Sequence, residues 1–314
     1  MANIKTLAKR EEEQVRFGWG HALCAGCGIP IVVRTVLNSI KEPVVVANAT
    51  GCLEVATTLY PYTAWNVPWV HTAFENAAAT ISGVETAYRA LKKKGKVDGE
   101  IRFVAFGGDG GTYDIGLQAL SGALERGHRF LYVCYDNEAY MNTGIQRSSA
   151  TPLGAAATTE PPGKESFGKH RHRKDLTQIV AGHHIPYVAQ ASISHWQDLS
   201  RKVERAVSKE GPSFINVMST CFRGWRHEAK FTTEIARLAV EARFWPLYEI
   251  DEGEWRLNYV PEEPIAVRDW LKLQGRFSHL FRPEEKKDVL AQIQAEIDRG
   301  WEELLARCKV APTV

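Results

Sequence analysis

The sequence lacks long hydrophobic runs and any marked imbalance of charge. No apolar stretch among its 314 residues approaches the roughly 20 residues that a membrane-spanning helix needs. Residues 1–15 are charged and contain no apolar signal core. The 39 basic and 37 acidic residues give a formal net charge of +2, which does not favour nucleic-acid binding driven by bulk charge. We therefore expect a cytoplasmic protein with no membrane and no nucleic-acid partner.

Cysteine is scarce, and the chain has neither an internal repeat nor a low-complexity tract. In a cytoplasmic chain, six cysteines more often serve metal or redox chemistry than disulfides. Hydrophobic residues make up 44% and charged residues 24%, which predicts an ordinary folded core. The length suits one large α/β domain with additions, or two modest domains.

Strand-like and helix-like segments alternate through the first two thirds of the chain. Short apolar runs predict strands at 43–47, 101–106, 130–135 and 213–218, and helical spacings lie between them. This alternation implies right-handed crossovers and a doubly wound, mostly parallel sheet covered on both faces.

The pattern changes after Trp225. Residues 232–244 and 284–306 have the spacing of amphipathic helices and are joined by irregular segments rich in Trp, Pro and Glu. We therefore divide the chain into an α/β domain at 1–225 and a C-terminal extension at 226–314. The extension is expected to pack on the core or on a partner subunit.

The strongest single feature is Gly108-Asp109-Gly110, which follows a predicted strand and opens a helix. Asn137 ends the next strand, so it should share with Asp109 the sheet edge where open α/β sheets bind ligands. The glycines allow close backbone approach, and a helix N-terminus offers free N–H groups to an anion. Asp109, Asn137 and the carbonyl of Ala139 are oxygen donors of the kind that Mg²⁺ prefers. The pattern predicts a Mg²⁺-bridged diphosphate, and its alternative is a glycine turn and a strand-end Asn without a ligand.

Four cysteines are candidate metal ligands. Cys24 and Cys27 form a Cys-x-x-Cys pair in a glycine-rich stretch, and Cys52 and Cys221 follow singly. Four thiolates can hold a [4Fe–4S] cluster or a zinc ion. Spacing alone leaves open a cluster, a zinc ion and buried inert cysteines. The roles of the other two cysteines also stay open: Cys134, which lies in mid-strand, and Cys308.

The Gly-Asp-Gly segment, followed by the pair Asp136-Asn137, resembles the thiamine diphosphate signature. This resemblance favours the cluster, because thiamine intermediates can be oxidised by one-electron acceptors. Longer motifs lie at 20–28, 47–52, 60–65, 74–77, 108–116 and 135–144. Together they resemble the thiamine-binding β subunit, or the corresponding domain, of the 2-oxoacid:ferredoxin oxidoreductases. The resemblance covers about residues 17–250.

The resemblance implies the thiamine-diphosphate-binding type of α/β fold and a role for each matching position. The proximal [4Fe–4S] cluster would be held by Cys24, Cys27, Cys52 and Cys221, and Mg²⁺ by Asp109, Asn137 and Ala139. The cofactor would be lined by Thr50, Gly51, Gly108, Gly110, Gly111, Thr112 and Thr143. Asn142 is the catalytic candidate, directed toward the thiazolium and the substrate. Its alternative is a loop Asn that bonds its own backbone.

The resemblance also implies what this chain lacks. The glutamate that activates the aminopyrimidine usually belongs to a partner subunit. The ferredoxin-type run Cys-x₂-Cys-x₂-Cys-x₃-Cys is absent, so further clusters would lie on other chains. We therefore expect a subunit that is catalytically incomplete alone and works with those subunits, with ferredoxin and with a small oxoacid.

Several departures from the pyruvate enzymes bear on the substrate. Segment 221–225 reads Cys-Phe-Arg-Gly-Trp instead of Cys-Pro-Thr-Gly-Trp, alanines follow Gly154 where Trp is common, and Ile29 replaces a common Glu. Arg223 and the basic stretch 169–174 would suit a more anionic substrate. We therefore lean toward oxalate, oxidised to carbon dioxide without coenzyme A.

The alternative substrate is pyruvate, converted with coenzyme A to acetyl-CoA and carbon dioxide. Two more distant alternatives remain. One is a non-oxidative thiamine enzyme with a structural zinc ion, and the other is a non-catalytic subunit that retains a vestigial pocket.

Overall fold

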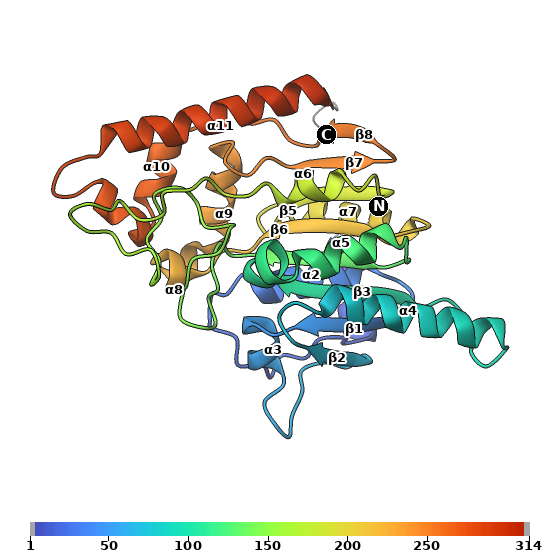
Figure 1. Cartoon of the computed structure of the whole chain (residues 1–314). Helices are drawn as coiled ribbons and strands as arrows, with labels where there is room; N and C mark the ends of the chain where they lie inside the picture. The colour runs from blue at the N-terminus through green and yellow to red at the C-terminus, as the bar shows by residue number, and fades with distance from the viewer. Residues whose placement is uncertain (1–3, 311–314) are drawn as a thin grey trace.

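The computed structural model describes residues 4–310, and one nine-stranded sheet runs through them (Figure 1). The strands lie in the order β2-β1-β3-β4-β6-β5-β7-β8-β9. Their bounds are β1 Val44–Ala49, β2 Trp69–Thr72, β3 Arg102–Gly108, β4 Leu131–Asp136, β5 Tyr187–Ser192, β6 Ser213–Met218, β7 Tyr248–Asp251, β8 Glu254–Leu257 and β9 Lys309–Val310. All pairings from β2 to β5 are parallel, whereas β7 and β8 are antiparallel additions. The predicted doubly wound, mostly parallel sheet is confirmed.

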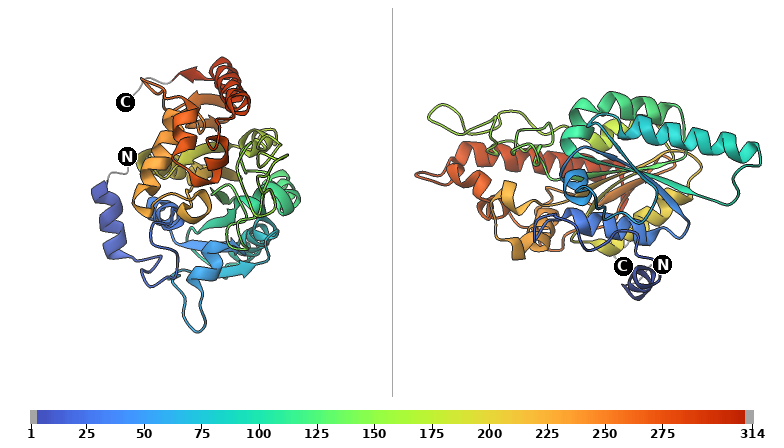
Figure 2. Two further views of the ribbon diagram at one scale, coloured as in Figure 1. Left: turned by 90° about the vertical axis from the view of Figure 1, so that its left-hand side faces the viewer. Right: turned by 90° about the horizontal axis from the view of Figure 1, so that it is seen from below.

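Helices cover both faces of this sheet, as the right panel of Figure 2 shows. The α-helices are α1 Ile4–Glu13, α2 Ile29–Ser39, α3 Cys52–Thr57, α4 Ala77–Lys93, α5 Leu117–Glu125, α6 Leu176–Ala181, α7 Trp196–Ser208, α8 Phe222–Trp225, α9 Thr232–Glu241, α10 Val267–Lys272 and α11 Lys287–Arg307. Two hydrophobic cores result, one under α2 and α7 and the other under α4 and α5. Successive side chains of β3 alternate between them, with Val104 in the first and Phe103 in the second.

The described part of the C-terminal extension continues the same sheet. The two predicted helices are found as α9 and α11, but the hairpin of β7 and β8 was not predicted. Each of these strands has only four residues, too few to show an alternating pattern. The indole of Trp245 donates a hydrogen bond to the Ala191 carbonyl of β5, 2.7 Å away, which fastens the extension to the core.

The loop at 144–173 connects β4 to α6 and is not simply a surface segment. Residues 150–157 are buried, whereas residues 161–165 are exposed. The ammonium of Lys169 is buried and donates to the carbonyls of Ser148 and Ser149, both 3.2 Å away, and to that of Thr151. The first half of this loop is therefore part of the interior.

None of the helices in residues 4–310 has the length and apolar character needed to cross a membrane.

Candidate cofactor site

The two halves of the predicted thiamine signature meet at one edge of the sheet. β3 and β4 are parallel neighbours, with Gly108 beside Tyr135 in the register. A cleft with about 320 Å³ of empty space opens where these strands end. Every residue predicted to bind the cofactor lines this cleft except Thr112. Asn142 is exposed at its mouth.

The side chain of Thr112 has a different place from the one predicted. Its hydroxyl donates to the Gly108 carbonyl at 2.7 Å and lies 3.1 Å from the hydroxyl of Tyr132. These bonds close the turn after β3 from inside the protein. The hydroxyl therefore stabilises the glycine turn instead of facing the cleft.

Three candidate cation ligands converge in the cleft. One terminal atom of the Asn137 amide lies 2.9 Å from the Ala139 carbonyl oxygen and 3.0 Å from Asp109 Oδ1. The amide has two possible orientations. If this atom is the amide nitrogen, it donates hydrogen bonds to both oxygens; if it is the amide oxygen, the three oxygens together form a set of cation ligands. Neighbouring oxygens of an octahedral Mg²⁺ shell are about 2.9 Å apart when each lies about 2.05 Å from the ion. The spacing of these atoms therefore fits Mg²⁺.

The carboxylate of Asp109 is buried and needs a positive partner. Burial raises its pKa well above the usual value, nearby Asp136 adds to this increase, and the hydrogen bond from Ser148 opposes it. Ser148 Oγ donates to Asp109 Oδ2 at 2.5 Å, and the Asn137 backbone N–H donates to Oδ1 at 3.3 Å. A cation in the cleft would stabilise the ionised form.

Glycines shape the wall of the cleft beside Tyr135. A Cβ on Gly51 would lie 2.9 Å from the Tyr135 hydroxyl, and one on Gly108 would lie 3.1 Å from its ring. The hydroxyl is buried and has no hydrogen-bond partner among the described residues. A buried tyrosine hydroxyl usually has such a partner. The glycines thus make room for Tyr135, whose hydroxyl is an unused polar group available to a ligand in the cleft.

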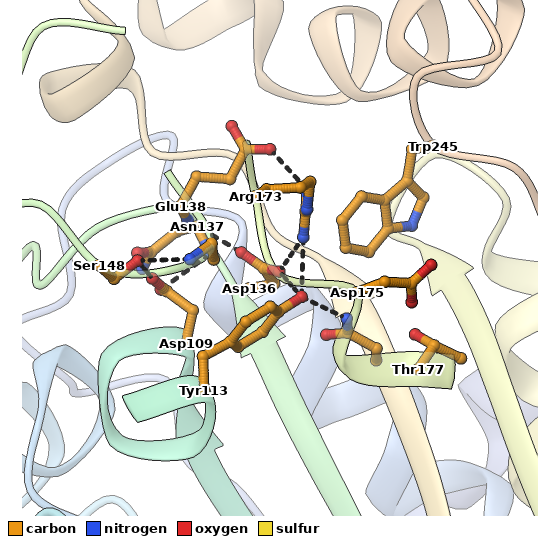
Figure 3. A network of polar contacts seen from close by, with 12 residues as sticks. Asp109, Tyr113, Asp136, Asn137, Glu138, Ser148, Arg173, Asp175, Thr177 and Trp245 are labelled. Carbon is orange, nitrogen blue, oxygen red and sulfur yellow. Dashed lines mark hydrogen bonds and ion pairs between the residues drawn. The ribbon is translucent and has the colours of Figure 1, made fainter. Parts of the chain in front are cut away.

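A buried ionic network braces the cation site from behind (Figure 3). Asp136 Oδ2 accepts hydrogen bonds from Tyr113 at 2.6 Å and from Arg173 at 2.7 Å. Glu138, which has a left-handed φ of 67°, accepts from Arg173 at 3.0 Å and from Arg276 at 2.5 Å. Burial raises the pKa of Glu138, and the two guanidinium groups oppose that increase.

Arg276 connects the C-terminal extension to two loops of the site. Its guanidinium lies 3.9 Å from the ring centroid of Trp225, whose indole donates to the Asn137 carbonyl at 2.8 Å. Trp225 follows the candidate ligand Cys221 by four residues. The pairing of Arg276 with Glu138 cannot be predicted from the sequence, because the two residues are 138 positions apart and no local pattern links them.

Basic residues that favoured an anionic substrate make contacts within the protein. The basic stretch 169–174 is largely engaged: Lys169 holds loop carbonyls, and Arg173 pairs with Asp136 and Glu138. Burial lowers the pKa of Lys169 to about 8. Arg223 is exposed, and no basic residue is among the described residues that line the cleft. The described residues of the cleft therefore give no support to the use of these cations for a dianion.

The other departures also lie outside the cleft. Ile29 is buried in the core at the start of α2. Alanines 155–157 are buried, and the Ala156 N–H donates to the Arg276 carbonyl at 2.9 Å. A Cβ on Gly154 would meet the Leu280 side chain at 3.1 Å. These small residues make room for the C-terminal extension and say nothing about the substrate.

The four candidate cysteine ligands gather at one place beside this cleft. The pKa of Cys27 and that of Cys52 are raised to about 12, first by burial and then by neighbouring cysteines, including Cys24 and Cys221. The Cys27 N–H donates to the Cys24 carbonyl at 3.0 Å, and the Gly224 N–H donates to Cys221 Sγ at 3.4 Å. Within residues 4–310, no three His, Cys, Asp or Glu side chains are close enough to hold a single metal ion.

The remaining two cysteines lie elsewhere. Cys134 is fully buried in β4, as expected of a core residue, and Cys308 is partly buried near the end of α11. Cys52 differs from all the others because it also lines the cleft.

Comparison with known proteins shows similarity that extends over nearly the whole chain. The family described as thiamine pyrophosphate enzyme, C-terminal TPP binding domain, matches residues 49–217. The pyruvate synthase subunit PorB of Thermotoga maritima is 52% identical, covering 96% of this chain and 95% of that protein. The PorB subunit of Methanocaldococcus jannaschii is 58% identical over 84% of this chain and 89% of its own.

One further relative and one solved structure are also similar to this chain. The ketoisovalerate oxidoreductase subunit VorB of Pyrococcus abyssi is 45% identical, covering 91% of each chain. A solved 2-oxoglutarate:ferredoxin oxidoreductase from Magnetococcus marinus has a TM-score of 0.52 and 21% identity, covering 68% of this chain and 76% of that one. The last likeness concerns the fold alone.

Proposed function

Because this chain belongs to the thiamine-diphosphate-binding β subunits of the 2-oxoacid:ferredoxin oxidoreductases, we propose that it serves a pyruvate-oxidising member of that family. The enzyme would convert pyruvate and coenzyme A to acetyl-CoA and carbon dioxide and pass electrons to ferredoxin. The identity of 52–58% with two pyruvate synthase subunits carries this proposal. It replaces the oxalate that the sequence departures favoured, since those residues lie away from the cleft.

A branched 2-oxoacid is the second candidate substrate. The relative named for ketoisovalerate is 45% identical over nearly the same length. Overall sequence identity alone therefore distinguishes only weakly between pyruvate and a branched 2-oxoacid. Among the described residues that line the cleft, the apolar side chains near Asn142 are Met141, Tyr140 and Phe74. Much of the substrate pocket would belong to a partner subunit, which would select between the two acids.

In the proposed cofactor arrangement, Asp109, Asn137 and the Ala139 carbonyl hold Mg²⁺. The convergence of these oxygens supports it. Thiamine diphosphate would supply the electron sink for decarboxylation. Gly108 and Gly110 would let the diphosphate approach the backbone, and exposed Asn142 would orient the substrate at the mouth of the cleft.

Cys24, Cys27, Cys52 and Cys221 would hold one [4Fe–4S] cluster. The thiols of these residues influence one another's pKa, which supports a shared site. The chemistry of four thiolates suits such a cluster. Since Cys52 also lines the cleft, the cluster would lie beside the thiamine.

Partner subunits would complete the enzyme. No glutamate is among the described residues that line the cleft, so the group that activates the aminopyrimidine would come from another chain. The further clusters that lead to ferredoxin would also lie on other chains.

The test is an assay of the anaerobically purified complex. Dye reduction is measured with pyruvate, ketoisovalerate and oxalate, each with and without coenzyme A. We expect the highest kcat/KM with pyruvate and a requirement for coenzyme A. Preference for ketoisovalerate would select the second candidate, and reduction by oxalate without coenzyme A would overturn both.

A further inference from the structure

An exposed aromatic arm projects from the chain between α3 and β2. The arm, residues 58–64, is the long loop below these elements in Figure 1. Tyr60 is 97% exposed, Tyr62 79% and Leu59 56%. Two large tyrosine rings this exposed are unusual in a surface that only meets water, and they mark interaction sites in other proteins.

The base of the arm is firmly fastened. The Ala64 N–H donates to the Thr57 carbonyl at 2.8 Å, and the indole of buried Trp65 donates to the Thr57 hydroxyl at 2.9 Å. At the tip, the Tyr62 N–H donates to the Leu59 carbonyl at 2.7 Å. The arm is thus held in position before any partner arrives, which reduces the entropy lost on binding.

The segment that contains the arm is rich in apolar side chains and carries no charge of its own, and its charged neighbours are Glu54, which accepts from Thr58, and Arg34, whose guanidinium lies 5.9 Å from the Trp19 ring. The Gly18 N–H donates to the Ala64 carbonyl at 2.6 Å, which places neighbouring Trp19, 70% exposed, beside the arm. Val55 of α3 is also exposed. Residues 55–70 contain no Asp, Glu, Lys or Arg, although 24% of the whole chain is charged. Depletion of charge together with enrichment in Tyr and Trp is typical of the buried centre of an interface.

The arm adjoins the cofactor cleft, which a partner subunit would complete in the proposed function. It begins where α3 ends, and α3 starts at Cys52, which lines the cofactor cleft. A partner chain that completed this cleft would approach the protein at the edge of the sheet from which the arm projects.

We propose that the arm, with Trp19 and Val55, is the docking surface for the partner subunit that closes the thiamine cleft. This inference rests on the proposed function. The partner would offer an apolar groove for the two tyrosine rings and hydrogen-bond acceptors for their hydroxyls.

The test is co-expression of a Tyr60→Ser, Tyr62→Ser double variant with the other subunits. Assembly is measured by native mass spectrometry and size-exclusion chromatography over a dilution series. Removal of two interface anchors should raise the dissociation constant at least about 30-fold. Both side chains are exposed, so the thermal unfolding of the isolated variant should match that of the wild type.

The matched control is Leu91→Ser with Ile179→Ser, two exposed hydrophobics on α4 and α6, which should leave assembly unchanged. Assembly of the tyrosine variant at wild-type affinity would overturn the proposal. Loss of self-association with an intact heteromeric complex would also overturn it, because the arm would then bind a second copy of this chain. If assembly depends on the arm but the wild-type complex oxidises no 2-oxoacid, only the proposed function fails.

Discussion

The two candidate cofactor sites of this chain are built differently. The cation site is braced by a buried network in which Asp136 and Glu138 pair with Arg173 and Arg276. The cysteine site is assembled from three separate segments, and Cys24 is exposed. The first site is therefore largely organised by the protein itself, whereas the second would need a bound metal group to hold the sulfurs together. Four substitutions would break or sharpen this contrast.

The largest effect is expected for Asp109→Asn. Loss of the buried carboxylate should weaken Mg²⁺ and thiamine diphosphate binding by more than about 100-fold, beyond the range typical of outer-shell changes. Because burial raises the pKa of Asp109, the Tm of the metal-free chain should not fall. Isothermal titration calorimetry and thermal unfolding measure the two quantities. Asp114→Asn, which can still accept from the Ser149 N–H, is the control.

Cys52→Ser should separate the two sites. The iron and sulfide content should drop and ferredoxin reduction should stop, while thiamine diphosphate remains bound, because Asp109 and Asn137 are untouched. Iron analysis and cofactor content measure this. Cys308→Ser, remote from the cleft, should keep the full cluster. Normal ferredoxin reduction by the Cys52 variant would refute the ligand assignment.

Arg276→Gln tests the ion pair through which the C-terminal extension supports the cation site. Outer-shell changes typically cost 10–100-fold in metal affinity, and we expect a loss of about that size for Mg²⁺. The free energy of unfolding should fall by about 1–3 kcal/mol, because Glu138 loses one of its two cationic partners. Arg268→Gln breaks only solvent-exposed ion pairs, with Glu285 and Asp269, and should leave Mg²⁺ affinity and stability nearly unchanged. Equal losses of Mg²⁺ affinity and stability in the two variants would argue against a supporting role of Arg276.

The smallest effect is expected for Ser148→Ala. It removes the hydrogen bond to Asp109 Oδ2 but leaves the carboxylate in place. Mg²⁺ affinity should fall by about 10-fold, the lower end of the outer-shell range. Thiamine diphosphate binding as a function of Mg²⁺ concentration measures it. An unchanged affinity would show that the backbone alone orients Asp109.

The features that could be predicted from the sequence are those that a short motif determines. Gly108-Asp109-Gly110 and Asn137 each lie directly after a strand, so the parallel sheet brings them together without further information. Arg276 could not be found this way, because its partners are far along the chain. The hairpin of β7 and β8 was missed because four-residue strands carry too little periodicity.

The preference for oxalate lacks structural support for a related reason. Basic residues at 169–174 were interpreted by their charge alone, but only the fold reveals which carboxylates and carbonyls already neutralise or hold them. Likewise, the alanines after Gly154 follow from packing against the extension, which no local motif predicts. The four cysteines were identified by motif, and their gathering at one place required the fold.

The most direct test of the account compares the wild-type complex with the Asp109→Asn complex, both purified anaerobically. Electron paramagnetic resonance spectra are recorded after addition of pyruvate and, separately, of dithionite. We predict that pyruvate reduces the cluster of the wild type, whereas the variant keeps a full cluster that only dithionite reduces. Reduction of the variant by pyruvate, or a wild-type chain without an iron–sulfur signal, would contradict the claim that the thiamine cleft and the four cysteines act as one unit.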